Sequence, residues 1–479
     1  MHKGNYEAFT KEGYLQTYPQ QAGLILFYYF VSFLLGSSTV LGLQIINVFA
    51  YVCFIYCIYH IALLLWKNTT IAAFSGVLTF SFLPLLFYTT FVYGTLIGLA
   101  LSTLSILKAL EFIRKQKVSS AIFCSIFAGC SVVIKKNYII AVVAIVLVLL
   151  VYGIVKRHWS LFICSLLLLI ATLSFTKITS MAMESISGCT LGDGMPSITW
   201  VTMGLQEGYR ADGWYNRYTI NTFVDNDFDP IATKQQAKKD LHNELSKFLH
   251  NKQYAVSFFY KKTASQWCEP TFQSLYINKV YSSYGERKFT TPPFIMSLIV
   301  KVLLPALDLF LSIALIGVMM YLLYNREQIK LLELLPGIVF LGGFLFHLFW
   351  EAKGQYTITY FVLLFPYCVK GYSCIYKRIE EVLLDQSHKD IASRWRSIAC
   401  IYHAIRPVTR LLIVLLIFNI ITLVVPSVKA TTNRFDQTYY TYLYNSGSEK
   451  KKSKVPTGKF IISTFDKKGY LDFSLKKPD

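Results

Sequence analysis

Residues 138–155 read YIIAVVAIVLVLLVYGIV, a run with no charged side chain. As a helix these residues would extend about 27 Å. A helix of roughly 20 apolar residues is long enough to cross the hydrocarbon core of a bilayer. Comparable apolar runs occupy residues 50–66, 161–175 and 411–425. The sequence therefore predicts an all-α, polytopic membrane protein.

Composition supports this class and argues against nucleic acid as a partner. Hydrophobic residues make up 54% of the 479 positions and charged residues only 15%, although the formal net charge is +20. The basic residues lie mostly in short segments beside the apolar runs, where Lys and Arg mark the cytoplasmic side of a membrane and attract anionic lipid. We therefore expect membrane lipids, and no nucleic acid, among the partners.

The apolar runs and their basic flanks predict about ten transmembrane helices. Basic residues at Lys67, Lys115, Lys156 and Arg326, and the segment 370–410, indicate the cytoplasmic ends. With this alternation, residues 179–293 form one large extracytoplasmic loop. The predicted spans are residues 41–66, 70–88, 91–112, 119–135, 138–155, 159–178, 294–323, 333–350, 356–376 and 409–427.

A shorter apolar run, AGLILFYYFVSFLLG at residues 22–36, precedes the first predicted span. It would extend only about 22 Å as a helix. A spanning helix here would put residues 1–20 inside, whereas an interfacial juxtamembrane helix keeps them outside with the large loop; we prefer the second interpretation. The predicted segments are then 1–38 (outer segment with this helix), 39–178 (six-helix bundle), 179–293 (outer loop), 294–429 (four-helix bundle) and 430–479 (polar, Lys-rich tail).

The outer loop contains the start of a calcium-loop pattern, Asp225, Asp227 and Asp229. The pattern then fails, because Pro230 replaces the glycine turn and Gln236 replaces the bidentate Glu. Asp229 followed by proline is instead typical of a helix N-cap. We predict no metal site and no cofactor. The same loop holds Cys189 and Cys268, for which a disulfide and two free thiols both stay open.

Four charged or titratable residues near the predicted outer boundary are candidates for binding. His347 and Glu351 have i,i+4 spacing, which predicts one shared helix face, and ionisable groups at membrane depth are often functional. The alternative for Glu351 is an ordinary pair with Lys353 among the headgroups. Lys135 and Lys136 are candidates for binding the phosphate of a lipid carrier; the alternative is snorkelling to headgroups.

Aromatic residues concentrate in two parts of the outer loop, among glycine, amide and acidic groups. Aromatic faces with a few fixed polar partners suit sugar rings, whereas the competing interpretation is that these side chains pack the loop onto the bilayer. The predicted sugar or acceptor contacts are Trp200, Trp214, Tyr215, Asn216, Trp267 and Glu269.

Several segments, taken in order, resemble a known family. They are YPQQAGLIL (18–26), LPLLFYTTFVYG (83–94), IKKN (134–137), WVTMGLQEG (200–208) with GWYN (213–216), and WEAKGQY (350–356). In this order they resemble bacterial GT-C class membrane glycosyltransferases of the protein O-mannosyltransferase and aminoarabinose-transferase group (glycosyltransferase family 39). The resemblance extends over roughly residues 1–376.

The resemblance implies a multi-pass protein of the bacterial plasma membrane that transfers a sugar from a polyprenyl-phosphate donor to a cell-envelope acceptor outside. It implies that Lys135 or Lys136 contacts the phosphate, and that Glu351 and Tyr356 line the outer cavity. An acid often present in the family's FVYG segment is replaced here by Thr95.

The family also uses an Asp in its first outer loop as general base. The first Asp of this chain is Asp193, so the catalytic residue stays unassigned. This departure predicts either a chain without the family's first helix or a catalytically inactive partner subunit. A transporter or flippase for a lipid-linked glycan is the alternative from another functional class.

Overall fold

The computed structural model describes residues 6–208, 211–282, 298–325 and 329–384, together with the short strands β1 (Thr464–Phe465) and β2 (Leu471–Asp472), which pair antiparallel. The predicted span 409–427 lies outside the described residues, as does the predicted tail except for these two strands. All other regular structure that the model describes is helical.

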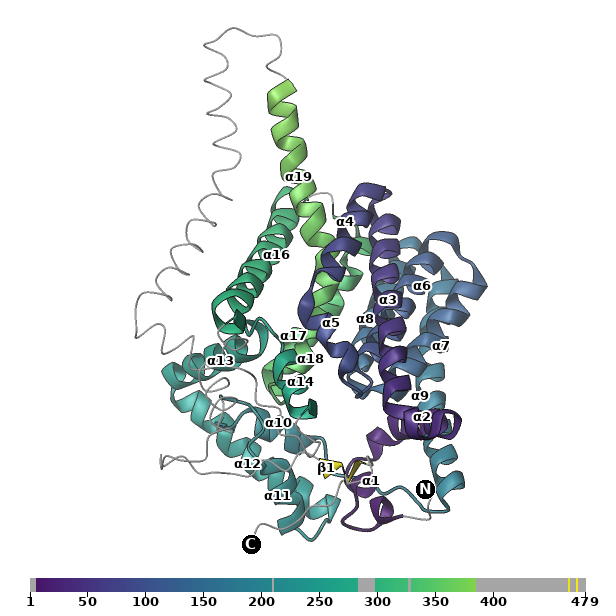
Figure 1. The fold of residues 1–479 in the computed structure, drawn as a ribbon, viewed down its shortest axis with the longest axis vertical. Helices are drawn as coiled ribbons and strands as arrows, with labels where there is room; N and C mark the ends of the chain where they lie inside the picture. Colours follow the sequence, from purple (N-terminus) through teal and green to yellow (C-terminus); the bar gives the residue numbers. More distant parts are fainter. Residues whose placement is uncertain are drawn as a thin grey trace.

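Two groups of long helices run in a common direction and form the body of the molecule (Figure 1). Among the described residues, seven helices are long and apolar enough to cross a membrane, or eight if one bent pair counts as a single span. This result agrees with a helical, multi-pass membrane protein. The first group is α3 (Thr39–Trp66), α4 (Thr69–Phe80), α5 (Leu83–Phe87), α6 (Thr95–Lys115), α7 (Val118–Ile134), α8 (Ile139–Lys156) and α9 (Trp159–Ser187); the second is α16 (Leu304–Asn325), α17 (Leu335–Phe349), α18 (Gly354–Phe361) and α19 (Phe365–Leu384).

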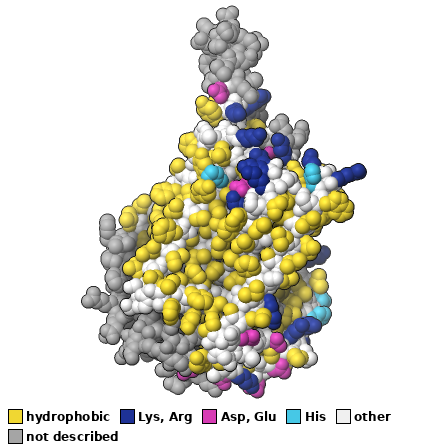
Figure 2. Space-filling model, turned by 90° about the vertical axis from the view of Figure 1, so that its right-hand side faces the viewer, with side chains coloured by type: hydrophobic (Ala, Val, Ile, Leu, Met, Phe, Trp, Pro, Cys, Tyr) yellow, Lys and Arg dark blue, Asp and Glu magenta, His cyan; other side chains and the backbone are white. Residues whose placement is uncertain are grey.

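The outside of this body is apolar around its middle. Figure 2 shows a broad hydrophobic band with Lys and Arg side chains gathered beyond one edge and charges of both signs beyond the other. Large apolar side chains on this surface point outward, including Phe49 and Leu173, each 71% exposed. A soluble protein rarely exposes an apolar surface of this extent, so the band fits contact with lipid.

The first described residues form short elements and one longer helix. These are η1 (Glu7–Phe9), α1 (Tyr14–Thr17), η2 (Pro19–Gln21), α2 (Ala22–Leu35) and η3 (Gly36–Ser38). Gly36 has φ 53°, a left-handed value that glycine adopts without a steric penalty, and it ends α2. Figure 1 shows α2 lying across the end of α3.

The described residues of the predicted outer loop that follow α9 (188–208 and 211–282) fold into a helical domain at that same end of the bundle, which we name the outer domain after this prediction (Figure 1). The Asp229 carboxylate accepts a hydrogen bond of 2.7 Å from the Ile231 amide, which confirms the predicted N-cap. The helices of this domain are α10 (Ile198–Gly204), α11 (Tyr218–Asp225), α12 (Pro230–His250), α13 (Lys252–Trp267) and α14 (Ser274–Ser282); the remaining short turns are η4 (Tyr88–Thr90), η5 (Lys136–Tyr138), η6 (Ile299–Leu303), η7 (Leu331–Leu334) and η8 (Val362–Leu364).

Some predicted boundaries were wrong. The span predicted at residues 70–88 is divided into α4 and α5, with a bend of 55°. Pro84 lies in the first turn of α5, where a backbone N–H would have no hydrogen-bond partner within the helix. In the middle of a continuous helix the missing N–H of proline would leave one hydrogen bond unformed. Helix α9 continues to Ser187, beyond the predicted end at 178. Cys189 and Cys268 are free thiols.

The arrangement predicts which side of the membrane each end occupies. In a Cys268→Ser background, which removes an exposed thiol, a membrane-impermeant maleimide should label Ser197→Cys in intact cells. Lys117→Cys, in the basic α6–α7 connection, should react only after permeabilisation. Both positions are exposed. The reverse pattern of labelling would contradict the topology.

Candidate functional site

The structure separates the two lysines that the sequence could not distinguish. Lys135 follows the last residue of α7 in an extended conformation (φ −155°, ψ 113°), before η5 begins. This break in the helix leaves Lys136 exposed and Lys135 partly buried. Lys135 is therefore the better placed of the two for an enclosed binding site.

Aromatic rings surround the Lys135 ammonium group. Its Nζ lies 5.6 Å from the centre of the Tyr93 ring and 5.3 Å from that of Tyr356, within the range of cation–π attraction. Nζ also donates a hydrogen bond of 3.1 Å to the Thr95 hydroxyl. Within the described ranges Lys135 forms no ion pair. Burial, with a smaller effect of Lys353, lowers the pKa of Lys135 to about 7.

Glu351 lies next to Tyr356, in the short break between α17 and α18. Its side chain is 5% exposed, and the Tyr356 hydroxyl forms a hydrogen bond with it. Burial raises the pKa of Glu351, while nearby Lys353 and Lys262 oppose that shift. Tyr356 thus contacts both the cation and the carboxylate.

The predicted shared helix face of His347 and Glu351 was wrong. Helix α17 ends at Phe349, and Trp350 is already extended, because Ala352 pairs with the outer domain through a bridge to Trp214. His347 is fully buried, and its ring stacks on Tyr356 with centroids 5.7 Å apart. His347 therefore packs against the Tyr356 ring and helps to fix its position.

The first described residues cover these groups. Tyr14 forms a hydrogen bond with Tyr93, and Gln21 donates one of 3.2 Å to the same hydroxyl. The Tyr18 ring lies 6.2 Å from that of Trp200. We call the set Tyr14, Tyr18, Tyr93, Lys135, Glu351 and Tyr356 the tyrosine site. Tyr14, Tyr18 and Tyr93 were not predicted to be site residues, although residues 1–30 are rich in tyrosine.

Two of the six predicted sugar contacts lie beside the tyrosine site. Trp200 stacks on Trp350, with ring centroids 5.9 Å apart and an interplanar angle of 5°. Tyr215, 37% exposed, is near enough to influence the pKa of Tyr18, which burial raises. Both therefore offer aromatic surface at the edge of the site.

The other four predicted contacts lie elsewhere. Trp214 is buried and donates a hydrogen bond of 2.8 Å to Ser265. Asn216 bonds to Gln206 and lines a separate polar cavity of about 600 Å³. Trp267 packs on two phenylalanines of α17. Glu269 accepts hydrogen bonds from the Thr271 and Gln273 amides and so shapes its own turn.

A buried lysine joins the outer domain to the membrane helices next to this site. Lys262 of α13 donates hydrogen bonds to the carbonyls of Gly204, Leu348 (2.9 Å) and Trp350 (2.8 Å). Burial lowers the pKa of Lys262 to about 7, and Glu351 opposes that shift. A Cβ at Gly204 would lie 2.4 Å from the Phe349 carbonyl oxygen, so only glycine permits this close approach.

Within the described ranges, no group of His, Cys, Asp and Glu side chains has the geometry to hold a metal ion. Comparison with protein-family models, with curated proteins and with solved structures finds no match. The side chains of the tyrosine site offer a lysine with no ion pair among the described residues, a buried carboxylate and aromatic faces.

Removing the Lys262 ammonium should destabilise the protein. Lys262→Met removes the donor from one buried and two partly buried carbonyl groups, and a fully buried carbonyl without a donor costs about 1–3 kcal/mol. We expect a lower midpoint of thermal unfolding in detergent. Lys261→Met, at the exposed neighbouring position, is the matched control. Equal midpoints for the two variants would show that Lys262 does not join the two parts.

Proposed function

We propose that this protein is a membrane glycosyltransferase that takes a sugar from a polyprenyl-phosphate donor and passes it to a cell-envelope acceptor on the extracytoplasmic side. The observation that carries the proposal is the environment of Lys135. Its ammonium is enclosed by the Tyr93 and Tyr356 rings and by one neutral hydroxyl, with no carboxylate paired to it among the described residues.

Such a cation suits a phosphate. Aromatic faces stabilise the ammonium without neutralising it, and the Thr95 hydroxyl is uncharged, so positive charge is left for an anion. A bound phosphate would favour the protonated form of Lys135 and raise its pKa above the value of about 7 that burial imposes. In transfer, the same cation would offset the charge that builds on the leaving phosphate.

We assign the role of general base to Glu351. As a general base, its carboxylate would take the proton of the acceptor's nucleophilic group while the acceptor attacks the anomeric carbon. The bond from that carbon to the phosphate oxygen breaks, and polyprenyl phosphate leaves with the electron pair. The raised pKa of Glu351 makes it a stronger base than an exposed carboxylate, and its hydrogen bond to Tyr356 fixes its orientation.

The adjacent lysines allow a direct test of phosphate binding. We expect Lys135→Ala to weaken binding of polyprenyl phosphate to the protein in nanodiscs by about tenfold or more, because a charge-assisted hydrogen bond contributes about 1.5–3 kcal/mol. Lys136→Ala should bind like the unaltered protein, since Lys136 is exposed. Native mass spectrometry with titrated lipid measures both. If the two variants weaken binding equally, the phosphate does not lie at Lys135.

A second experiment tests transfer itself. The protein is reconstituted with radiolabelled polyprenyl-phosphate sugars and envelope acceptors, and release of labelled polyprenyl phosphate is followed. We expect Glu351→Gln to slow release by about 10²–10⁴-fold while lipid binding stays intact.

The outcome of that experiment separates the candidate functions. Equal rates of release for the unaltered protein and for Glu351→Gln would show that Glu351 is not the general base. Binding without any release, across the whole donor panel, would contradict a transferase and favour a flippase or an inactive partner subunit.

A further inference from the structure

Helix α13 lies at the level where the membrane helices end. Its Phe259 ring contacts Phe349, the last residue of α17, with centroids 6.5 Å apart. Its terminal Trp267 contacts Phe340 and Phe344 at 5.3 and 5.4 Å. The C-terminal half of α13 thus packs against aromatic side chains of α17.

One side of α13 carries apolar side chains that nothing in the described part of the chain covers. Val256 is 71% exposed and Tyr260 is 64% exposed, although both lie within one turn of Phe259. The opposite side of the helix is packed, with Phe258 and Lys262 fully buried. The exposed apolar side therefore results from the helix orientation and not from loose packing.

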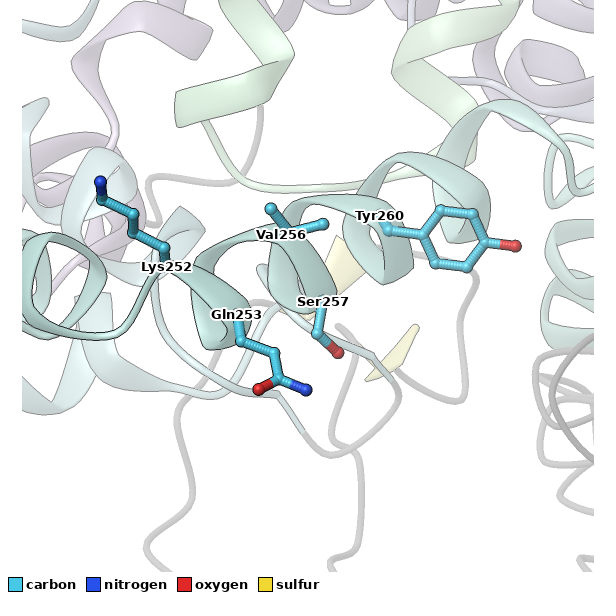
Figure 3. Close-up of a pocket in the computed structure, with 5 residues that line it drawn as sticks. All are labelled: Lys252, Gln253, Val256, Ser257 and Tyr260. Carbon is cyan, nitrogen blue, oxygen red and sulfur yellow. The ribbon is translucent and has the colours of Figure 1, made fainter.

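These residues line a shallow groove on the surface of α13, together with Lys252, Gln253 and Ser257 (Figure 3). In this view Lys252 and Val256 lie toward one edge of the groove, Gln253 and Ser257 toward the other, and Tyr260 at its end. A charged end, an apolar middle and an aromatic end thus follow one another along this side of the helix.

Apolar side chains are also exposed on the membrane helix beside α13. Leu345 and Phe349 of α17, the helix that α13 contacts, are 51% and 50% exposed, and α17 belongs to one of the candidate membrane spans. A helix with apolar and aromatic residues on one side, a lysine at its end and a position at this depth is typical of interfacial helices.

We propose that α13 is a second interfacial helix, which inserts the Val256–Tyr260 edge among the lipids of the adjoining leaflet and holds an anionic phospholipid headgroup with Lys252. Tyrosine favours the headgroup level of a bilayer, and a lysine near the surface attracts anionic lipid. This inference does not depend on the transferase proposal, because it concerns how the outer domain rests on the membrane.

Photo-crosslinking tests the insertion. The photoreactive amino acid p-benzoylphenylalanine replaces Val256 in one variant and Lys261, which is exposed on another side of the helix, in the matched control, in full-length protein reconstituted into vesicles of phosphatidylethanolamine and phosphatidylglycerol. We expect phospholipid crosslinks from position 256 and few from position 261. Replacement of Tyr260 provides an independent third position on the apolar edge, with the same expectation as position 256.

The lipid class in the crosslinked product tests the role of Lys252. Phosphatidylglycerol should be enriched over its share of the vesicle, and Lys252→Ala should reduce that enrichment by about fivefold. Equal lipid crosslinking from positions 256, 260 and 261 would overturn the insertion. Crosslinks from position 256 only to protein would show that a protein covers this edge, and unchanged enrichment in Lys252→Ala would remove the headgroup contact.

Discussion

The ammonium group of Lys262 is the interaction on which the geometry of the tyrosine site depends. It brings together the carbonyls at the ends of α10 and α17, which belong to the outer domain and to the membrane helices. Three donors meet three acceptors, so a buried charge is solvated by the backbone instead of by water. The break after α17, where Glu351 lies, is held in position by these bonds.

The electrostatics of the tyrosine site follow from what surrounds its two ionisable groups. Rings enclose Lys135 where many proteins would place a carboxylate, so the cation is stabilised while its charge stays available. Glu351 is removed from water and turned toward Tyr356. Because Tyr356 contacts both groups, a change at one is expected to affect the position of the other.

The sequence could predict the features that depend on local patterns. The apolar runs predicted most of the long helices, and Asp229 with Pro230 predicted the start of α12, because hydrophobic length and capping act within a few residues. The bend between α4 and α5 depends on packing around Pro84, and the end of α17 depends on pairing between Ala352 and a distant tryptophan. Such contacts leave no local pattern.

The candidate site was predictable to a similar extent. Lys135 and Glu351 were named from their unusual positions at the membrane boundary and Tyr356 from the family resemblance, and the structure places the first two beside the Tyr356 side chain. No sequence pattern indicated that Lys262 is buried, since a lysine on an amphipathic helix is ordinarily exposed. Tyr14 and Tyr93 come together in the site only because the first described residues of the chain pack beside Tyr93.

The separation of Lys135 and Tyr356 along the chain has a consequence for biosynthesis. About 220 residues lie between them, so at ordinary synthesis rates roughly 10–45 s pass before the second ring can reach the lysine. During that interval α7 and α8 are already made, and Lys135 has only Tyr93 and Thr95 of its final neighbours. A nascent membrane protein therefore carries this cation at the bilayer boundary, accessible to headgroups or insertion machinery, until its last helices arrive.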